Sequence, residues 1–197
     1  QMHMNQVPHC NISPSNVVLT SSDDVYVTDM GFIQPHFFRR QDYNVISFFY
    51  PRNHTEFYLS PERIDPNTVR TEFVNLRLST EDKQQGMLLK SDSFALGCVI
   101  YKFVTKGRVL FNLQRVYDLS SSSDYRAFLK ADMEEVKNVK IRELILEMVD
   151  PNWETRISVQ EAFKRWNSLH LSSPIESHAV IYHFQYLLRQ MTLSRPD

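Results

Sequence analysis

Residues 8–31 read PHCNISPSNVVLTSSDDVYVTDMG, a stretch in which two short runs rich in β-branched residues flank a polar cluster. The two runs are residues 17–19 and 25–28, and residues 20–24 between them are of the types that form turns. This pattern predicts a β-hairpin, whose two central aspartates form the turn rather than bind a ligand.

Polar residues stand at both ends of the predicted hairpin. Asn16 precedes the first run and Asp29 follows the second. An amide oxygen and a carboxylate are hard ligands, of the kind that magnesium takes together with phosphate oxygens. Both residue types also satisfy backbone groups in tight loops. Two interpretations therefore remain open: a magnesium site at Asn16 and Asp29, or two loop residues that only hydrogen-bond to the backbone.

The composition fits a single domain with one core of ordinary size. The chain has 197 residues, of which 42% are hydrophobic, and a net charge of -1. It lacks the basic stripe that nucleic-acid binding usually needs, so we expect no nucleic-acid partner. The seven histidines lack metal-ligand spacing, which argues against a zinc site. The two cysteines, Cys10 and Cys98, form no disulfide framework and indicate a reducing, cytoplasmic compartment.

The first ten residues are polar and begin with Gln1. We therefore expect neither a signal peptide nor a transmembrane segment, and we expect the start to be a truncation. The four glycines of the chain are too far apart to form a G-x-G-x-x-G phosphate loop. A nucleotide cradle of that type is not expected within these residues.

Several segments after the hairpin have the patterns of packed elements. Residues 32–58 carry nine aromatic side chains, and such a segment packs onto its domain or binds a partner. Residues 91–105 are apolar on all sides, as in a buried helix. Asp92 within that helix needs a partner, because an unpaired buried carboxylate would cost several kcal/mol. An apolar face at 141–148 and a capping box at 158–161 predict two further helices.

A break at Pro174 precedes a last apolar stripe, which recurs at helical spacing. The stripe consists of Ile181, Phe184, Leu188 and Met191. We expect this segment to dock, either on its own domain or on a partner chain.

Four motifs resemble those of eukaryotic protein kinases and follow one another in the same order. Residues 9–16, HCNISPSN, stand where kinases have H-R-D-x-K-x-x-N, and residues 29–31, DMG, stand where they have D-F-G. Residues 55–62, TEFYLSPE, are similar to T-x-x-Y-x-A-P-E, and residues 91–105 to S-D-x-W-S-x-G-x-x-x-Y-E-L-x-T. The resemblance covers about residues 8–168. It implies the kinase large lobe, a mainly α fold with a small β-hairpin that carries the catalytic and metal loops, without the small N-terminal lobe.

The resemblance also implies a division of the chain into a kinase-like lobe at 1–170 and a helical extension at 171–197 that leads out of it. Within the lobe it implies a catalytic loop at 8–16, a metal loop at 29–31, an activation segment at 32–62 and a central helix at 91–105.

Departures from the kinase motifs bear on catalysis. Asn11 stands at the position of the aspartate that accepts the substrate proton, and Ser13 at that of the lysine that neutralises the transferring phosphoryl group. An amide cannot take up a proton at neutral pH, and general-base catalysis is worth about 10² to 10⁴ in rate. Cys10 replaces the arginine that reads a phosphorylated activation segment. The resemblance thus implies a pseudokinase with impaired or absent phosphotransfer, in which Asn16 and Asp29 keep the metal-binding positions.

Other matched positions have structural roles in the kinase family. They are His9, Gly31, Thr55, Glu62, Asp92 and Arg156. The resemblance implies that Asp92 braces the backbone of the catalytic loop and that Arg156 forms an ion pair with Glu62.

Within the kinases, the sequence most resembles the kinase-like regulatory subunits of class III phosphatidylinositol 3-kinase complexes. The hairpin, the aromatic segment and Phe94 in place of the usual tryptophan carry this resemblance. It implies a phosphatidylinositol 3-kinase catalytic subunit as partner, a role in endosomal trafficking and autophagy, and peripheral membrane association through the complex. It implies Mg²⁺ and ATP as cofactors, bound weakly or only together with a small lobe.

Two other hypotheses remain open. The first is a truncated but active serine/threonine kinase that uses Asp29 and Asn16 for magnesium and transfers the γ-phosphate of ATP to protein hydroxyls. The second is a generic α-helical interaction module, which would make the four motif matches a coincidence.

Overall fold

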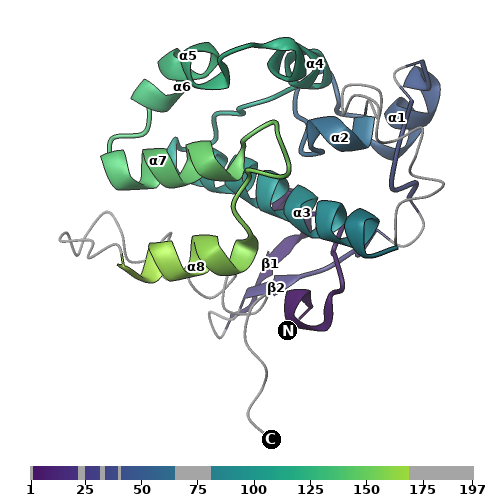
Figure 1. The fold of residues 1–197 in the computed structure, drawn as a ribbon, viewed down its shortest axis with the longest axis horizontal. Coiled ribbons are helices and arrows are strands. Elements are labelled where there is room, and N and C mark those ends of the chain that lie inside the picture. The colour runs from purple at the N-terminus through teal and green to yellow at the C-terminus, as the bar shows by residue number, and fades with distance from the viewer. Residues whose placement is uncertain (1, 22–24, 32–33, 40, 65–80, 169–197) are drawn as a thin grey trace, which may run out of the picture.

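The computed structural model describes residues 2–21, 25–31, 34–39, 41–64 and 81–168 (Figure 1). The predicted turn at the tip of the hairpin and the predicted stripe after Pro174 lie outside the described residues.

Helices make up most of the described structure. The elements in chain order are η1 (His3–Asn5), η2 (Pro14–Asn16), β1 (Val17–Leu19), β2 (Val25–Val27), α1 (Tyr43–Phe49), α2 (Pro61–Ile64), α3 (Glu81–Val104), α4 (Leu113–Ser121), α5 (Tyr125–Phe128), α6 (Lys130–Glu134), α7 (Val139–Met148) and α8 (Val159–Ser168). The predicted fold class, mainly α with one small hairpin, is confirmed. None of the helices in this described part has the length and hydropathy that crossing a bilayer requires.

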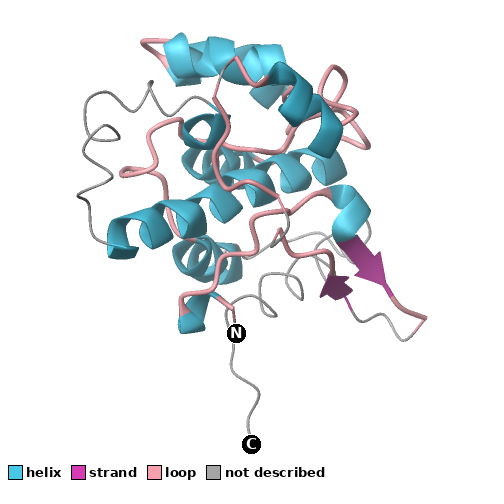
Figure 2. Ribbon diagram, turned by 90° about the vertical axis from the view of Figure 1, so that its right-hand side faces the viewer, coloured by secondary structure: helices cyan, strands magenta, loops and turns pink. Residues whose placement is uncertain are grey.

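The strands β1 and β2 form the predicted antiparallel hairpin, which lies at the edge of the helical part of the molecule (Figure 2). Val18 pairs with Tyr26, and both side chains are nearly half exposed. Val17 pairs with Val27, and both pack against the core. Successive side chains of a strand point to opposite faces, so the hairpin lays one face on the helices and turns the other outward.

Helix α3 lies at the centre of the molecule, and α7 and α8 pack beside it (Figure 1). It begins at Glu81, ten residues before the predicted start at 91. Residues 91–101 are buried all round, as the sequence predicted. A Cβ atom on Gly97 would lie 2.9 Å from Met148 Cβ and from Val149 Cγ1, so only glycine permits this close approach of α3 to the end of α7.

The two helices predicted after residue 140 form as α7 and α8. The apolar face of α7 at 141–148 is buried in the core. At the start of α8, Ser158 Oγ accepts a hydrogen bond from the backbone N–H of Glu161 at 3.1 Å, which is one half of the predicted capping box. Trp166 on α8 is 1% exposed and closes the core against α3.

Candidate functional site

Asp92 holds the backbone at the start of the predicted catalytic loop, residues 8–16. Its carboxylate accepts hydrogen bonds from the backbone N–H groups of His9 at 2.6 Å and Cys10 at 2.8 Å, and His3 Nε2 lies 2.8 Å from the same carboxylate. All four residues are at most 3% exposed, so water screens these contacts little. The bracing contact predicted for Asp92 is present. His3 is a further partner of Asp92 that could not be predicted, because no motif or spacing marks it.

The predicted metal loop at 29–31 lies directly against the predicted catalytic loop. The Gly31 N–H donates to the His9 carbonyl at 2.9 Å. A Cβ atom on Gly31 would lie 3.1 Å from both the Cβ and the carbonyl oxygen of Cys10, so a side chain there would push the loops apart. Cys10 and Asp29 have φ angles of 63° and 57°, in the left-handed region that residues with a Cβ rarely adopt. Such angles persist where the surroundings hold the backbone.

Asn11 supplies one of the contacts that hold the metal loop. Its Nδ2 donates to the backbone carbonyl of Asp29 at 2.8 Å. The Asn11 carbonyl in turn accepts from Asn16 Nδ2 at 2.7 Å, and the Asn16 carbonyl accepts from the Thr28 N–H at 2.8 Å. An aspartate at position 11 would have no proton for the Asp29 carbonyl, because an ionised carboxylate only accepts. The amide therefore clamps the two loops together.

The neighbouring His9 and Cys10 side chains are not arranged for proton transfer or nucleophilic attack. Burial lowers the pKa of His9 more than the nearby Asp92 charge raises it, so the ring is neutral at pH 7. Its Nδ1 lies 3.3 Å from the Asn11 N–H, which donates to it. Burial raises the pKa of the Cys10 thiol to about 12, and a protonated thiol is a weak nucleophile. The surroundings of His9 and Cys10 are therefore those of structural residues and not of catalytic ones.

The residues at 16 and 29 leave two oxygens for a cation. Asn16 Oδ1 has one long contact, 3.4 Å from Ser15 Oγ, and the exposed Asp29 carboxylate has one, 3.4 Å from Thr28 Oγ1. Among the described residues no group of three or more His, Cys, Asp or Glu side chains could hold a metal by itself. Magnesium commonly uses one or two carboxylates and completes its shell with water and substrate phosphates, so the two residues fit Mg²⁺ bound together with a nucleotide. Asn16 Nδ2 at the same time satisfies a backbone carbonyl, so the two interpretations are compatible for this residue.

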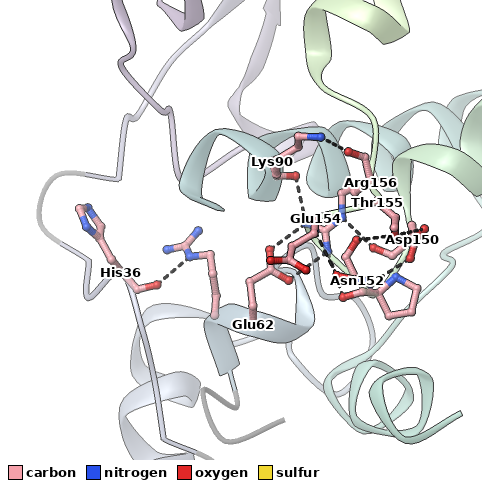
Figure 3. Close-up of polar contacts among 10 residues, drawn as sticks. His36, Glu62, Lys90, Asp150, Asn152, Glu154, Thr155 and Arg156 are labelled. Atoms are coloured by element: carbon pink, nitrogen blue, oxygen red, sulfur yellow. Dashed lines mark hydrogen bonds and ion pairs between the residues drawn. The ribbon is translucent and has the colours of Figure 1, made fainter. Parts of the chain in front are cut away.

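Glu62 and Arg156 form the predicted ion pair (Figure 3). Arg156 Nη1 and Nη2 lie 2.7 and 2.9 Å from the two Glu62 carboxylate oxygens, and both side chains are fully buried. The remaining Arg156 donors reach the backbone carbonyls of Asp150, Lys90 and Pro151 at 2.7, 3.0 and 3.4 Å. All five N–H groups of the guanidinium are used, which is the condition under which a buried charge is tolerated.

A cavity of about 330 Å³ lies between the catalytic loop, residues 49–59 and α3. The structure brings Asn11, Ser13 and Asn16 together in its wall, whereas Asp29 and Thr55 are not among the lining residues. Ser13 Oγ lies 2.8 Å from Ser15 Oγ, within hydrogen-bond distance. The remaining wall is largely apolar and includes Ile12, Phe49, Pro51, Phe57, Leu59 and Ala95.

Two further features of this region were not identified from the sequence. Arg63, in α2, donates from Nη1 to the Cys10 carbonyl at 2.6 Å and from Nε to the His36 carbonyl at 2.9 Å. Lys102, in α3, lies 2.6 Å from Glu56 in the activation segment and holds the pKa of that carboxyl below its usual value. The signal for Lys102 was in the motif, since lysine stands where the kinase pattern has an acid. No signal pointed to Arg63 beyond its place next to Glu62.

Comparison with known proteins gives the following matches. The family model described as "Protein kinase domain" matches residues 1–166, more than four-fifths of the chain. The serine/threonine-protein kinase VPS15 of Saccharomyces cerevisiae is 28% identical over 199 aligned positions, which cover 99% of this chain and 13% of that protein. The VPS15 kinase of Arabidopsis thaliana is 28% identical over 168 positions, 84% of this chain and 10% of that protein. A putative serine/threonine-protein kinase VPS15 of Komagataella pastoris is 25% identical over 188 positions, 94% of this chain and 13% of that protein. The chain therefore spans about an eighth or less of the length of these relatives.

Proposed function

The chain belongs to the protein kinase family, and from this premise we propose that it is the large lobe of a kinase-like regulatory subunit of a class III phosphatidylinositol 3-kinase complex. In this proposal the lobe acts as a scaffold, and its phosphotransfer is impaired or absent. The similarity to VPS15 kinases supports the assignment to this group.

The observation that carries the proposal is the hydrogen bond from Asn11 to the Asp29 carbonyl. In phosphotransfer, the group at this position takes the proton of the attacking hydroxyl. The Asn11 amide has no basic site at neutral pH, and its N–H is already committed to the metal loop. Loss of a general base alone lowers a rate by about 10² to 10⁴.

The second lost group is the positive charge at position 13. Ser13 is neutral and lies within hydrogen-bond distance of its neighbour Ser15, so it offers nothing that would offset charge on a transferring phosphoryl group. Asn16 and Asp29 would hold Mg²⁺ if a nucleotide were bound, and the ion would supply charge neutralisation on its phosphates. In this proposal, the remaining role of Asn16 and Asp29 is to bind the cation and to keep the shape of the loops.

The proposal includes a place in the cell and a partner. A lobe of this kind would lie in the cytoplasm, peripheral to endosomal or autophagic membranes, and would contact the lipid-kinase catalytic subunit of its complex. Residues 171–197 would form a helical extension that leads from the lobe toward further domains.

Affinity purification of the full-length protein from its own cells tests the complex. We expect a phosphatidylinositol 3-kinase catalytic subunit to be recovered in near-equal amount. Repeated purification without any such subunit, under conditions that preserve other known complexes of similar affinity, would count decisively against this part of the proposal.

A second candidate function is an active serine/threonine kinase. It is favoured by the names of the relatives and by the exposed carboxylate of Asp29, which remains able to bind a cation. The assay is transfer of labelled γ-phosphate by the full-length protein, with Asp29→Ala as the control. We expect no transfer above that control, and transfer that Asp29→Ala abolishes would establish the kinase instead.

A further inference from the structure

Arg63 joins two segments that are far apart in the sequence. Its guanidinium donates from Nη1 to the Cys10 carbonyl at 2.6 Å, and from Nε to the His36 carbonyl at 2.9 Å (Figure 3). Nη2 makes a longer contact, 3.4 Å from the Pro35 carbonyl. The side chain therefore connects residues 8–16, the predicted catalytic loop, to residues 34–39 in the predicted activation segment.

The backbone of Arg63 holds the second of these segments as well. Its carbonyl accepts from the Phe38 N–H at 2.7 Å, so both the side chain and the main chain of Arg63 bind residues 35–38. Phe38 is 2% exposed, and its ring packs against those of Phe49 and Tyr50, with centroids 6.3 and 5.9 Å away. Contacts thus run from Arg63 through Phe38 to the end of α1.

The guanidinium lies where water and salt weaken these contacts little, because the Arg63 side chain is 1% exposed. Burial raises the pKa of the Cys10 thiol and of the Tyr50 hydroxyl, and the charge of Arg63 opposes both shifts. Such opposition requires that the charge lie close to both groups. The guanidinium is therefore enclosed beside Cys10 of the loop and Tyr50 of the predicted activation segment.

The chemistry of the two sides makes the contact independent of common switches. An arginine in a protein is not deprotonated, so the donors of Arg63 are always present. The acceptors are main-chain carbonyls, which take up no proton near neutral pH and carry no hydroxyl that a kinase could modify. Neither a pH change near neutrality nor phosphorylation therefore alters the donors or the acceptors of this contact.

We propose that Arg63 is a permanent latch, which holds residues 34–38 against residues 8–16 without phosphorylation of the chain. The predicted activation segment then keeps one conformation whether or not its exposed hydroxyl groups, such as that of Thr55, carry a phosphate. The latch goes beyond the scaffold function and depends neither on the complex nor on the loss of phosphotransfer.

Hydrogen exchange of the full-length protein, followed by mass spectrometry of its peptides, tests the latch. Phosphatase treatment first removes any phosphate, and the intact mass verifies that none remains. We expect the peptides that cover residues 8–16 and 34–39 to stay protected, including the Phe38 N–H. Thr55→Glu, whose carboxylate stands in for a phosphate, should change exchange in neither peptide by more than about twofold.

Two variants assign this protection to Arg63. Arg63→Met keeps the apolar stem and removes every donor, so exchange in both peptides should rise at least about tenfold, as the loss of one hydrogen bond to a charged group implies. Arg63→Lys keeps the charge but lacks the planar fork of donors that reaches both segments, so exchange should rise there too, by a smaller factor. Exchange in α7 should stay unchanged in both variants, because the latch is local.

Arg142→Gln is the matched control. Arg142 also donates to a backbone carbonyl, that of Val136, from Nε at 3.3 Å and from Nη2 at 2.8 Å. Donor and acceptor are only six positions apart there, so this arginine joins no distant segments. Exchange at residues 8–16 and 34–39 should equal that of the original protein.

Four outcomes would overturn the proposal. The first is phosphate-free protein in which residues 34–39 exchange as fast as an unfolded peptide, or a Thr55→Glu protein in which they change, because the segment would then depend on a phosphate. The second is unchanged exchange in a folded Arg63→Met or Arg63→Lys protein. The third is an equal rise in α7, or failure of both variants to fold, since Arg63 would then stabilise the whole lobe. The fourth is an equal rise after Arg142→Gln.

Discussion

The buried polar contacts around Asp92 and Glu62 differ from the catalytic loop that they support. Positions 92, 62 and 156 keep the charged residue types of the kinase pattern. Each of these charged groups is buried and makes its hydrogen bonds within the protein. In the loop, positions 10, 11 and 13 carry neutral residues instead of the charged ones of the pattern.

Physical chemistry accounts for this difference. Removing one member of a buried charged contact leaves its partner uncompensated, which destabilises the fold by several kcal/mol. Replacing a partly exposed loop residue, as at positions 11 and 13, by a neutral one costs little, because water takes over its contacts. A sequence can thus lose the chemistry of the loop and keep the buried contacts for stability alone. Four variants test how far the two regions differ.

Glu62→Gln should have the largest effect. The amide keeps the shape of the side chain but removes the charge that balances Arg156, which is fully buried. We expect the free energy of unfolding, from urea denaturation, to fall by about 3–5 kcal/mol. Glu161→Gln is the matched control: its ion pair with Arg165 is about half exposed, so the loss should be less than about 1 kcal/mol. Similar losses in both variants would mean that burial does not distinguish them.

Asp92→Asn should have the next largest effect. The amide has one acceptor oxygen where the carboxylate serves the N–H groups of His9 and Cys10 on separate oxygens and His3 as well. We expect a loss of about 2–3 kcal/mol, since hydrogen bonds to a charged group are worth about 1.5–3 kcal/mol. Faster hydrogen exchange at the N–H groups of residues 9 and 10 should accompany it.

The control for this variant is Asp118→Asn on α4, where an exposed aspartate accepts from the Gln114 amide at 2.9 Å. Stability there should stay within about 0.5 kcal/mol of the original protein. Unchanged exchange at residues 9 and 10 in Asp92→Asn would show that the loop holds its own shape.

The buried contacts could be predicted from the sequence to a large extent. The need of Asp92 for a partner follows from the apolar surroundings of its helix, since a buried carboxylate must be paired. The Glu62 to Arg156 pair, whose members are 94 positions apart, came from the resemblance to kinases and not from the spacing of the residues. The packing of Gly97 against the end of α7 had no signal, because a glycine in a helix does not say what approaches it.

The site could be predicted less well. The resemblance to kinases places Asn11 at the position of a catalytic base, but its role as a donor to Asp29 depends on how two loops 18 residues apart meet. The contact between Arg63 and the Cys10 carbonyl is of the same kind, because a backbone acceptor leaves no trace in residue types. The start of α3 at Glu81 was also missed, since residues 81–85 are all polar and lack the apolar side chains that marked the helix at 91–105.

Asn11→Asp tests the hydrogen bond from the Asn11 amide to the Asp29 carbonyl, which holds the two loops together. The aspartate restores the residue of the kinase pattern but faces the Asp29 carbonyl with an acceptor, so a hydrogen bond becomes a repulsion. We expect a loss of about 1–2 kcal/mol in the free energy of unfolding and no gain of γ-phosphate transfer.

Asn138→Asp is the matched control for Asn11→Asp. The Asn138 side chain only accepts, from the N–H groups of Lys140 and Ile141 at the start of α7, and a carboxylate accepts there equally well. Its stability should not fall. A stable Asn11→Asp protein that transfers phosphate would mean that the position is a base waiting to be restored and not a clamp.

The contact between Glu56 and Lys102 links residues 32–62 to α3. Its removal in Lys102→Met should have the smallest effect of the four variants. The hydrogen bond from Lys102 is the main cause that lowers the Glu56 pKa from its ordinary value of 4.5. A carboxyl with a lowered pKa in the folded state stabilises the protein above the pKa of the unfolded state, and this stabilisation is lost as the pH falls through the folded value. The stability difference between the original protein and Lys102→Met, less than about 1 kcal/mol at neutral pH, should therefore shrink as the pH falls below about 4.5.

Urea unfolding at a series of pH values measures this stability difference. Lys164→Met on α8 is the exposed control, and its stability difference from the original protein should not change with pH. A Lys102→Met difference that is the same at all pH values would assign the effect to packing of the lysine stem and not to its charge.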